Sequence, residues 1–460
     1  MVSGQNDELV KRIARLAKQN QELEEYIKKL EKANEKLTRD LERFKSAGLQ
    51  APSETGREES LKFNMATVLF ADIHGFSKLV EGIESSAIMD ELDEILYRFD
   101  ETVAGYKIQK IKTIGDTYMC AGGIPTKNIT NPIDVVMAAM EMRNHLEEYE
   151  LQKRGAKNRI WDLKIGIHTG PVTATISGKK KVSYDIKGDT VNTASRVEAV
   201  SENGKILLSV MTYELVKEFF DCKYFGKLPV KYKGDLQMYE VLGLKKEFSV
   251  NGEGRKPNEA FRIKYGLIQF TDIQEVVLDK LEKELPSYLF YHNVKHTVDI
   301  VTEVELIGWG EGCTDEEILL LKTAGLFHDA GHTVAYDDHE YHGTVIVREM
   351  LPRYNYSEEQ IDRICEIIMA TKLPPKPANL LEEIICDSDL DYLGRSDFIP
   401  VSNTLYEELK AQNKIGSLND WNKLQVKFIS GHQYFTNTAR SLREVNKQLQ
   451  IERISSLITD

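Results

Sequence analysis

The first 45 residues carry a heptad pattern of apolar positions. Leucine, isoleucine or phenylalanine occupies positions spaced alternately three and four apart, and Asn20 and Asn34 are the two polar exceptions. Isoleucine or asparagine at the a positions with leucine at the d positions favours a parallel two-stranded coil, and buried asparagines fix its register. We therefore predict a parallel dimeric coiled coil over residues 1–45, in preference to a lone amphipathic helix. A linker containing Gly, Pro and Ser follows over residues 46–60.

From about residue 61 the pattern changes to short β-branched runs that alternate with helical stretches. The strand-like runs include MATVLFADI, YKIQKIKTI, WDLKIGIHTG and LQMYEVLG. The helical stretches are residues 77–104, 132–153 and 188–200. This alternation predicts an α+β domain over residues 61–245, with a sheet covered by helices. A polar joint containing Gly and Pro follows over residues 246–262.

Residues 263–460 have a different texture, because helical periodicity dominates and strand candidates nearly vanish. We predict an all-α domain for this part of the chain. Seven of the ten histidines fall here, namely His292, His296, His328, His332, His339, His342 and His432. Since imidazole is a common ligand of divalent metals, this asymmetry makes a metal site in the helical domain worth testing.

Composition narrows the classes of function without choosing one. The 460 residues are 41% hydrophobic and 29% charged, which is ordinary for a soluble globular protein. A net charge of −13 argues against a nucleic-acid groove but not against one small triphosphate held by local cations. No apolar run has the length of a membrane span, and no signal peptide is visible. Five scattered cysteines without a CxxC pair indicate reduced thiols and a cytoplasmic location.

Two aspartates stand beside apolar, β-branched runs, where a strand or hairpin would present them. Asp72 lies in ATVLFADIHGF and Asp116 in KIKTIGDTYM. Two carboxylates held in this way can bind a pair of hard divalent cations, which accept oxygen ligands and phosphate. A third segment, VSYDIKGDTVNTASRVEA, adds Asp185, Asn192 and Arg196. Taken singly, an aspartate can also cap a turn and an arginine can sit in a surface salt bridge.

The order of five segments resembles the class III nucleotidyl cyclase catalytic domain over about residues 61–244. These segments are FADIHGF, KIKTIGDTYM, GIHTGPV, YDIKGDTVNTASR and VKYKGDL. The resemblance implies a ferredoxin-like domain with a βαββαβ core sheet. It also implies synthesis of a cyclic nucleotide through attack of the ribose 3′-hydroxyl on the α-phosphorus. Asp72, Asp116 and the backbone carbonyl of Ile73 match the groups that bind two Mg²⁺ or Mn²⁺ ions.

The same resemblance implies roles for residues that contact the nucleotide. Asn192 matches the residue that orients the ribose, and Arg196 matches the arginine that stabilises the transition state. Lys231 matches the lysine that holds the terminal phosphates, with Lys233 as a near substitute.

Lys112 and Asp185 match the pair that recognises adenine, so the expected substrate is ATP and the expected product cyclic AMP. Guanylyl cyclases resemble this segment but generally have Glu and a small residue at these two places, which keeps a guanylyl cyclase as the alternative.

In this family the metal-binding aspartates come from one protomer and the nucleotide-contacting residues from the other. This chain has both sets, so a symmetric homodimer would form two equivalent sites. The coiled coil over residues 1–45 would hold the two cyclase domains together and raise their effective concentration.

A second set of segments, YHNVKH, LFHDAGH, IIMATK and ICDSDLDYLG, resembles an HD-type metal phosphohydrolase over about residues 265–460. The YHNxxH opening is similar to the helical cyclic-nucleotide phosphodiesterases. By this resemblance His296, His328, Asp329 and Asp389 hold a divalent ion such as Mn²⁺, Fe²⁺ or Zn²⁺. His292 matches the general acid.

Three points about this second site stay open in the sequence. His332 resembles a contributor to a second metal or to phosphate binding. Asp387 competes with Asp389 for the last ligand position, and we prefer Asp389 because Leu390 follows it. The substrate is cyclic AMP or another nucleotide phosphate, unless the domain is a sensor that binds nucleotide and metal without catalysis.

Overall fold

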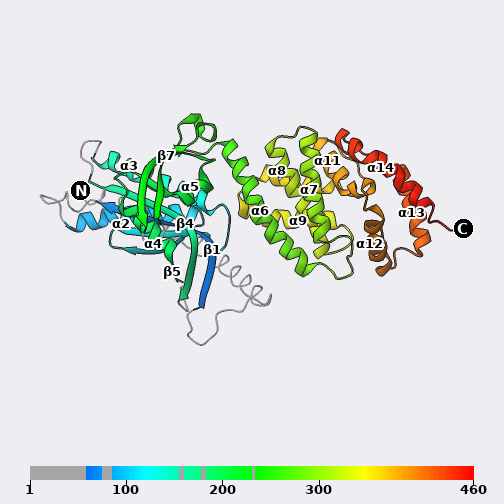
Figure 1. Ribbon diagram of the computed structural model, residues 1–460, viewed down its shortest axis with the longest axis horizontal. Coiled ribbons are helices and arrows are strands. Elements are labelled where there is room, and N and C mark those ends of the chain that lie inside the picture. The colour runs from blue at the N-terminus through cyan, green and yellow to red at the C-terminus, as the bar shows by residue number, and fades with distance from the viewer. Residues whose placement is uncertain (1–58, 75–84, 155–159, 178–182, 231–233, 460) are drawn as a thin grey trace, which may run out of the picture. The chain divides into compact units, whose positions relative to one another are not determined.

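A computed structural model gives the structure of most of the chain (Figure 1). The described residues are 59–74, 85–154, 160–177, 183–230 and 234–459. The predicted coiled coil, the linker after it, Lys231 and Lys233 lie outside these residues. No helix within the described residues combines the length and apolar character needed to cross a membrane.

The first half of the described chain has the predicted βαββαβ order. Its elements are β1 (Glu59–His74), α2 (Ser85–Gly105), β2 (Gln109–Ile114), β3 (Thr117–Gly122), α3 (Asn131–Arg154) and β4 (Asp162–Ser177). The strands lie in the order β2-β3-β1-β4. Strands β1 and β3 are antiparallel, as are β2 and β3. Strand β1 is therefore flanked by β3 on one side and β4 on the other.

The sheet continues beyond β4 with elements from the next part of the chain. These are β5 (Ser183–Lys187), α4 (Asp189–Ala199), β6 (Ile206–Ser209), α5 (Val210–Val216), β7 (Phe220–Val230) and β8 (Gly234–Leu244). Their order after β4 is β6-β8-β7, with β6 parallel to β4, while β5 pairs with β4 off this path. The α+β prediction is therefore confirmed as a mixed sheet with helices.

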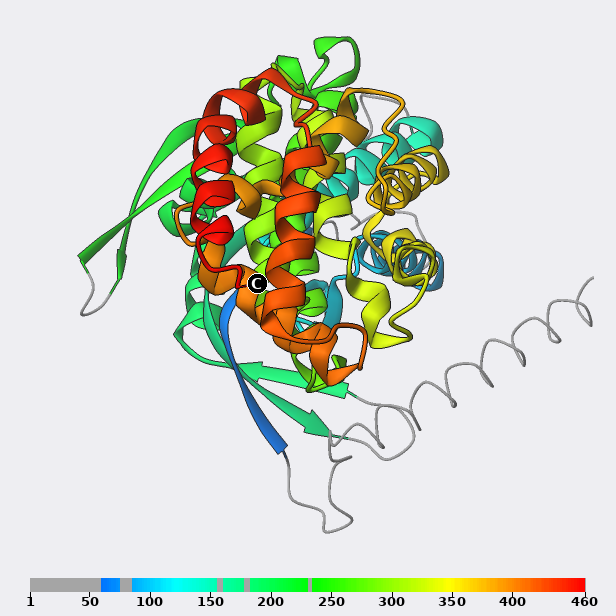
Figure 2. The same ribbon diagram turned by 90° about the vertical axis from the view of Figure 1, so that its right-hand side faces the viewer.

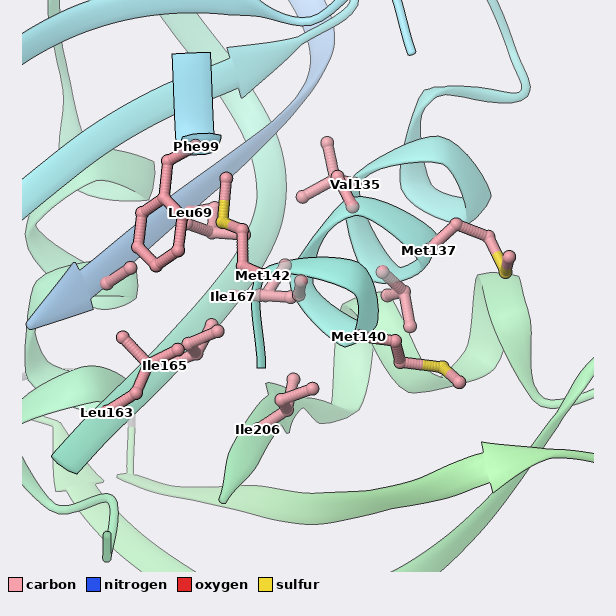
Figure 3. Close-up of a cluster of buried hydrophobic side chains, with 14 of the residues drawn as sticks. Leu69, Phe99, Val135, Met137, Met140, Met142, Leu163, Ile165, Ile167 and Ile206 are labelled. Carbon is pink, nitrogen blue, oxygen red and sulfur yellow. The ribbon is translucent and has the colours of Figure 1, made fainter. Parts of the chain in front are cut away.

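One face of this sheet is buried under helices α2 and α3. Leu69, Ala71 and Ile73 of β1 belong to the same buried cluster as Phe99 of α2 and Met142 of α3. Figure 3 shows Leu69 with these helical side chains and with Ile165 and Ile167 of β4. Since successive side chains of a strand point to opposite faces, Asp72 and Gly166 face away from this core.

The rest of the chain is helical, as predicted (Figures 1 and 2). Its helices are α6 (Glu259–Glu284), α7 (Val294–Gly310), α8 (Asp315–Phe327), α9 (His339–Met350), α10 (Glu358–Met369), α11 (Leu380–Asp389), α12 (Phe398–Ala411), α13 (Leu418–Gly431) and α14 (Asn437–Ser455). Short 3₁₀ turns include η4 (Ala330–Thr333) and η6 (Asp391–Gly394). The largest buried cluster joins apolar residues of α6, α7, α8, α10 and α11.

Candidate functional sites

A tight hairpin brings Asp116 next to Asp72. Strands β2 and β3 are joined by Gly115 and Asp116 alone, since Ile114 pairs with Thr117. Gly115 has φ +64°, which a glycine at the first central position of a two-residue hairpin loop readily adopts. Asp72 pairs with Thr117 in the β1–β3 register, and the Ile73 N–H donates to the Asp116 carbonyl at 3.1 Å.

The two aspartates form a group of potential metal ligands together with His74. One ligand atom from each of Asp72, His74 and Asp116 lies within 4.8 Å of the others. His74 Nε2 lies 2.9 Å from Asp72 Oδ2, and the Thr117 hydroxyl donates to Asp72 Oδ1 at 3.1 Å. Carboxylate oxygen atoms that are half-buried at the ends of these strands suit Mg²⁺ or Mn²⁺. Sequence reasoning missed His74, although its position two residues after Asp72 places both side chains on one face of β1.

Helix α4 covers the sheet face onto which Asp72 points. A Cβ built on Gly166 of β4 would lie 2.1 Å from the backbone nitrogen of Glu198, so the absence of a side chain permits this packing. Asn192 and Arg196 are four residues apart on α4, which puts them on one side of the helix. Both are exposed, and Arg196 forms no ion pair within the described residues. A guanidinium without an ion-pair partner among the residues described can donate to a phosphate.

The environment of Glu198 connects α4 with the aspartate pair. Glu198 is buried, and burial is the main cause that raises its pKa, to about 7. The negative charges of Asp72 and Asp116 raise it further, while Lys164 lowers it. A concentration of negative charge that disfavours another carboxylate favours a bound cation. The sequence gave no indication that Glu198 lies near the two aspartates, apart from its position two residues after Arg196.

The other predicted cyclase residues lie on separate elements. Lys112 is an exposed residue of β2, and Asp185 is a half-buried residue of β5. The side chain of Ile73 is fully buried. Lys231 belongs to the segment that the structure does not describe, so its predicted role stays a prediction.

The helical domain brings its predicted metal ligands together at helix ends. The Asn293 side chain caps α7 by accepting from the N–H groups of Lys295 and His296, which fixes His296 in the first turn. His328 is the C-cap of α8, and Asp389 is the last residue of α11. All of these ends converge on one buried cluster.

Four side chains surround a space of the size that one ion requires. His296 Nε2 lies 3.4 Å from Asp329 Oδ2 and 3.3 Å from Asp389 Oδ1. His328 Nε2 lies 3.2 Å from Asp329 Oδ2 and 3.3 Å from His296 Nε2. Ligand atoms held about 2.1 Å from one tetrahedral ion lie about 3.4 Å apart, so these separations fit a shared ion. Asp329 Oδ2 is buried without a hydrogen-bond partner within the described residues, as a ligand atom awaiting a cation would be.

The second oxygen of Asp329 faces another pair of histidines. Asp329 Oδ1 lies 3.5 Å from His339 Nε2 and 3.9 Å from His332 Nε2. The two imidazole rings stack with centroids 3.9 Å apart. His332 is 2% exposed, and both its ring nitrogens lack hydrogen-bond partners in the described part of the chain. Ligand atoms of His292, Asp329 and His332 lie within 4.8 Å of one another. Asp329 and His332, with His292 or His339 beside them, would hold a second ion.

Burial and charge together shift the pKa values of this cluster. Burial lowers the pKa of His332 to about 3, so its imidazole is neutral, the form that binds metals. Burial also opposes the charged form of His328, but Asp329 and Asp389 outweigh it and raise the pKa of His328 to about 9. The same negative charge favours a divalent cation between these residues.

Glu408 of α12 holds His292 beside the cluster. Its carboxylate accepts hydrogen bonds from the backbone N–H groups of Tyr291 and His292 at 2.9 and 3.1 Å. It also accepts from His292 Nδ1 at 2.5 Å, which leaves Nε2 to face the cluster. Burial alone would lower the pKa of His292, but Asp329 and Glu408 raise it. Glu408 is fully buried and was not found from the sequence.

Asp387 and Asp389, the two candidates for the last metal-ligand position, have different surroundings. Asp387 is fully buried and accepts hydrogen bonds from the N–H groups of Phe435 and Thr436 and from the Thr436 hydroxyl. These bonds hold the chain that enters α14. The structure therefore brings Asp389 to the histidines and occupies Asp387 elsewhere.

Comparison with known proteins gives matches to two family models. Residues 58–243 match the family model of the adenylate and guanylate cyclase catalytic domain, and residues 293–393 match the HD domain model. The chain is 36% identical over 198 residues to the receptor-type guanylate cyclase gcy-8 of Caenorhabditis elegans, covering 42% of this chain and 17% of that protein. It is 33% identical over 184 residues to an adenylate cyclase of Mycobacterium bovis, covering 40% of this chain and 41% of that protein.

A solved structure gives a further match. The adenylyl cyclase CyaB from P. aeruginosa is 30% identical, with a TM-score of 0.38, covering 43% of this chain and all of that one. The chain spans less than half the length of the guanylate cyclase gcy-8 and of the mycobacterial adenylate cyclase. The two family models show that the chain joins an adenylate and guanylate cyclase catalytic domain to an HD domain.

Proposed function

We propose that this protein is a homodimeric adenylyl cyclase that converts ATP to 3′,5′-cyclic AMP and pyrophosphate. The observation that carries the proposal is the Asp72–Asp116 pair, held by the β2–β3 hairpin at one face of the sheet. Helix α4 packs on that face, and its Arg196 is exposed and without an ion-pair partner in the described residues, so it can reach the aspartate pair of a second subunit. Carboxylates for cations and a free guanidinium are the groups that phosphate chemistry requires.

Each residue has a defined task in the proposed reaction. Mg²⁺ or Mn²⁺ at Asp72 and Asp116 would lower the pKa of the ribose 3′-hydroxyl and offset charge on the phosphates and the leaving pyrophosphate. Asn192 orients the ribose so that its 3′-oxygen faces the α-phosphorus. The Arg196 guanidinium donates hydrogen bonds to phosphate oxygens as their negative charge grows. Lys231 would hold the terminal phosphates.

The proposed catalyst is a dimer, because the residues form two half-sites. By the family's arrangement, Asp72 and Asp116 of one subunit face Asn192 and Arg196 of the other. Exposure of Asn192 and Arg196 in the single chain is consistent with a surface that a second copy covers. The predicted coiled coil over residues 1–45 would keep the two copies together at low concentration.

The choice of ATP rests on Lys112 and Asp185. A carboxylate accepts a hydrogen bond from the adenine amino group, and a lysine donates to a ring nitrogen. Guanylate cyclases among the relatives make GTP the second candidate. Product analysis from ATP and GTP with Mg²⁺ or Mn²⁺ tests both: we expect cyclic AMP from the parent and none from Asp72→Ala. Cyclic GMP as the main product would overturn the choice of substrate.

For the HD domain we propose hydrolysis of a nucleotide phosphate ester. Imidazoles and carboxylates suit divalent first-row ions. Asp329 Oδ2 and the His332 ring nitrogens are buried without hydrogen-bond partners among the described residues, which supports such a site. Ions bound there would act as Lewis acids and lower the pKa of the attacking water. His292, oriented through Nδ1 by Glu408, would donate the proton of Nε2 to the leaving oxygen.

A metal-binding sensor is the alternative for this domain. Mn²⁺-dependent release of product from a small diester, bis(p-nitrophenyl) phosphate, separates the two functions. Hydrolysis that His296→Ala abolishes supports the enzyme. Tight Mn²⁺ binding without any hydrolysis favours the sensor.

A further inference from the structure

A histidine stands beside the two aspartates of the cyclase domain, and the proposed reaction gives it no task. His74 is the last residue of β1, two positions after Asp72, so both side chains lie on one face of the strand. Asp116 reaches the same place from the β2–β3 hairpin. One ligand atom from each of the three residues lies within 4.8 Å of the others. The fold therefore places one nitrogen ligand and two oxygen ligands together.

The separation of His74 and Asp72 fits two neighbouring ligands of one ion. His74 Nε2 lies 2.9 Å from Asp72 Oδ2. Two ligand atoms that are each about 2.1 Å from an ion lie about 3.0 Å apart at a right angle and about 3.4 Å apart at the tetrahedral angle. The other oxygen, Asp72 Oδ1, accepts from the Thr117 hydroxyl at 3.1 Å, which directs Oδ2 toward His74. A distance of 2.9 Å also suits a hydrogen bond, so His74 is either a ligand or an orienting donor.

The two aspartates carry negative charge that the surrounding protein does not neutralise. No lysine or arginine within the described residues forms an ion pair with Asp72 or Asp116. The charge of both aspartates reaches the buried Glu198 and contributes to its raised pKa. Adjacent carboxylates without a countercharge favour a bound cation.

An imidazole ligand changes which cation such a group holds. Mg²⁺ takes oxygen ligands and is bound through one or two carboxylates together with substrate phosphates. First-row transition ions such as Zn²⁺ accept imidazole nitrogen, and enzymes hold Zn²⁺ with three protein ligands and one open position. The Mg²⁺ sites therefore need a nucleotide to complete them, whereas a transition ion needs only the three side chains.

We propose that Asp72, His74 and Asp116 form a binding site for a first-row transition ion such as Zn²⁺, which the chain holds without nucleotide and which regulates the cyclase by excluding Mg²⁺. The regulatory part rests on the proposed cyclase function, and the binding part does not. An ion held by the three residues occupies the two carboxylates that Mg²⁺ requires in the reaction. Zn²⁺ and Mg²⁺ therefore compete for one pair of aspartates.

The zinc content of the full chain, measured without nucleotide at buffered free Zn²⁺, tests the binding site. Ions held by the HD domain are common to the parent and to variants of the cyclase domain, so the difference in zinc per chain isolates this site. At the free Zn²⁺ that fills the parent site, we expect His74→Gln and Asp116→Ala each to hold one ion fewer. His145→Ala is the matched control, because the His145 side chain is 40% exposed, against 41% for His74, and pairs with Glu141 on one helix.

The glutamine variant separates a metal ligand from a hydrogen-bond donor. The amide of His74→Gln can still donate to Asp72, but an amide nitrogen does not bind a divalent ion. We expect the affinity for Zn²⁺ to fall by about tenfold or more, because a residue that only orients a ligand already changes metal affinity by about 10–100-fold when it is removed. Zinc binding by His74→Gln equal to that of the parent would overturn the proposal.

Inhibition by Zn²⁺ at a fixed concentration of Mg²⁺ tests the regulatory part. Activity is measured as pyrophosphate release, which hydrolysis of the cyclic product does not alter, and each variant is compared with its own rate without Zn²⁺. Half-inhibition of His74→Gln should require about tenfold more Zn²⁺ than that of the parent, and added Mg²⁺ should relieve the inhibition of the parent. Equal inhibition of the two chains, or Zn²⁺ that supports the reaction in place of Mg²⁺, would overturn regulation by this site. Absence of cyclase activity from the parent, with its zinc binding as expected, would count against the proposed cyclase function alone.

Discussion

Replacing Glu408 with glutamine tests how the HD domain holds its proton donor. The carboxylate accepts three close hydrogen bonds, from the N–H groups of Tyr291 and His292 and from His292 Nδ1. Hydrogen bonds to a charged acceptor contribute about 1.5–3 kcal/mol each, and those to a neutral acceptor about 0.5–1.5 kcal/mol. Loss of about 1 kcal/mol from each of three bonds gives about 3 kcal/mol in the free energy of unfolding.

The assay is thermal unfolding of Glu408→Gln beside Glu407→Gln. Glu407 is the exposed neighbour on the same helix, so it controls for the substitution itself. For a domain of this size, about 3 kcal/mol lowers the unfolding temperature by about 6–12 °C. We expect that shift for Glu408→Gln only. Unfolding temperatures that agree between the two variants would refute the reasoning.

The effect should also depend on pH, with a sign set by His292. The pKa of His292 is raised in the folded state. The pairing of His292 with Glu408 therefore stabilises the folded domain fully when the pH is below the ordinary histidine pKa. This stabilisation is lost as the pH rises through the folded-state pKa of His292. The folded pKa of Glu408 is lowered, because His292 and the backbone N–H groups outweigh burial. The stabilisation that the Glu408 carboxylate contributes is therefore lost as the pH falls through the folded-state pKa of Glu408. The difference between Glu408→Gln and the parent should be larger at pH 6 than at pH 9.

Two further predictions concern packing and metal content. Gly166→Ala should destabilise the cyclase domain by about 3 kcal/mol or more and reduce cyclic AMP synthesis, because its Cβ would lie 2.1 Å from the Glu198 nitrogen. Gly105→Ala is its control, since nothing lies within 4 Å of that Cβ, and equal unfolding free energies would contradict the packing argument. His339→Ala should lower the Mn²⁺ bound by the HD domain from two ions to one by elemental analysis, whereas His342→Ala should keep both. A single ion in the parent would show that Asp329 does not bridge.

Local patterns in the sequence predicted the strands and helices of the two domains. The apolar, β-branched run of β1 indicated a strand, and the apolar run before Asp116 indicated a strand end or hairpin at that residue. The resemblance to HD phosphohydrolases grouped His296 with His328, Asp329 and Asp389. The structure places His296, His328 and Asp389 at helix ends, close to one another.

Residues that depend on distant contacts were not predicted. Glu408 is 116 residues from His292, and a glutamate inside a helical pattern ordinarily faces solvent. His339 opens a new helix ten residues after Asp329, and only the close packing of η4 on α9 brings the two together. A Cβ on Gly331 would lie 1.9 Å from the His339 carbonyl oxygen, which shows how close that packing is. Such contacts arise from tertiary structure and leave no periodic signal.

Cyclase activity from a mixture of two inactive chains tests the central claim most directly. Asp116→Ala removes a metal ligand from one half-site, and Arg196→Ala removes the guanidinium from the other. Each variant alone should form no cyclic AMP from ATP. Hybrid dimers of the two keep one intact site, so the mixture should recover up to about one quarter of the parent's activity per chain, by random pairing of subunits with one of two sites intact. Absence of activity in hybrids whose assembly has been demonstrated would contradict a catalytic site shared between two subunits.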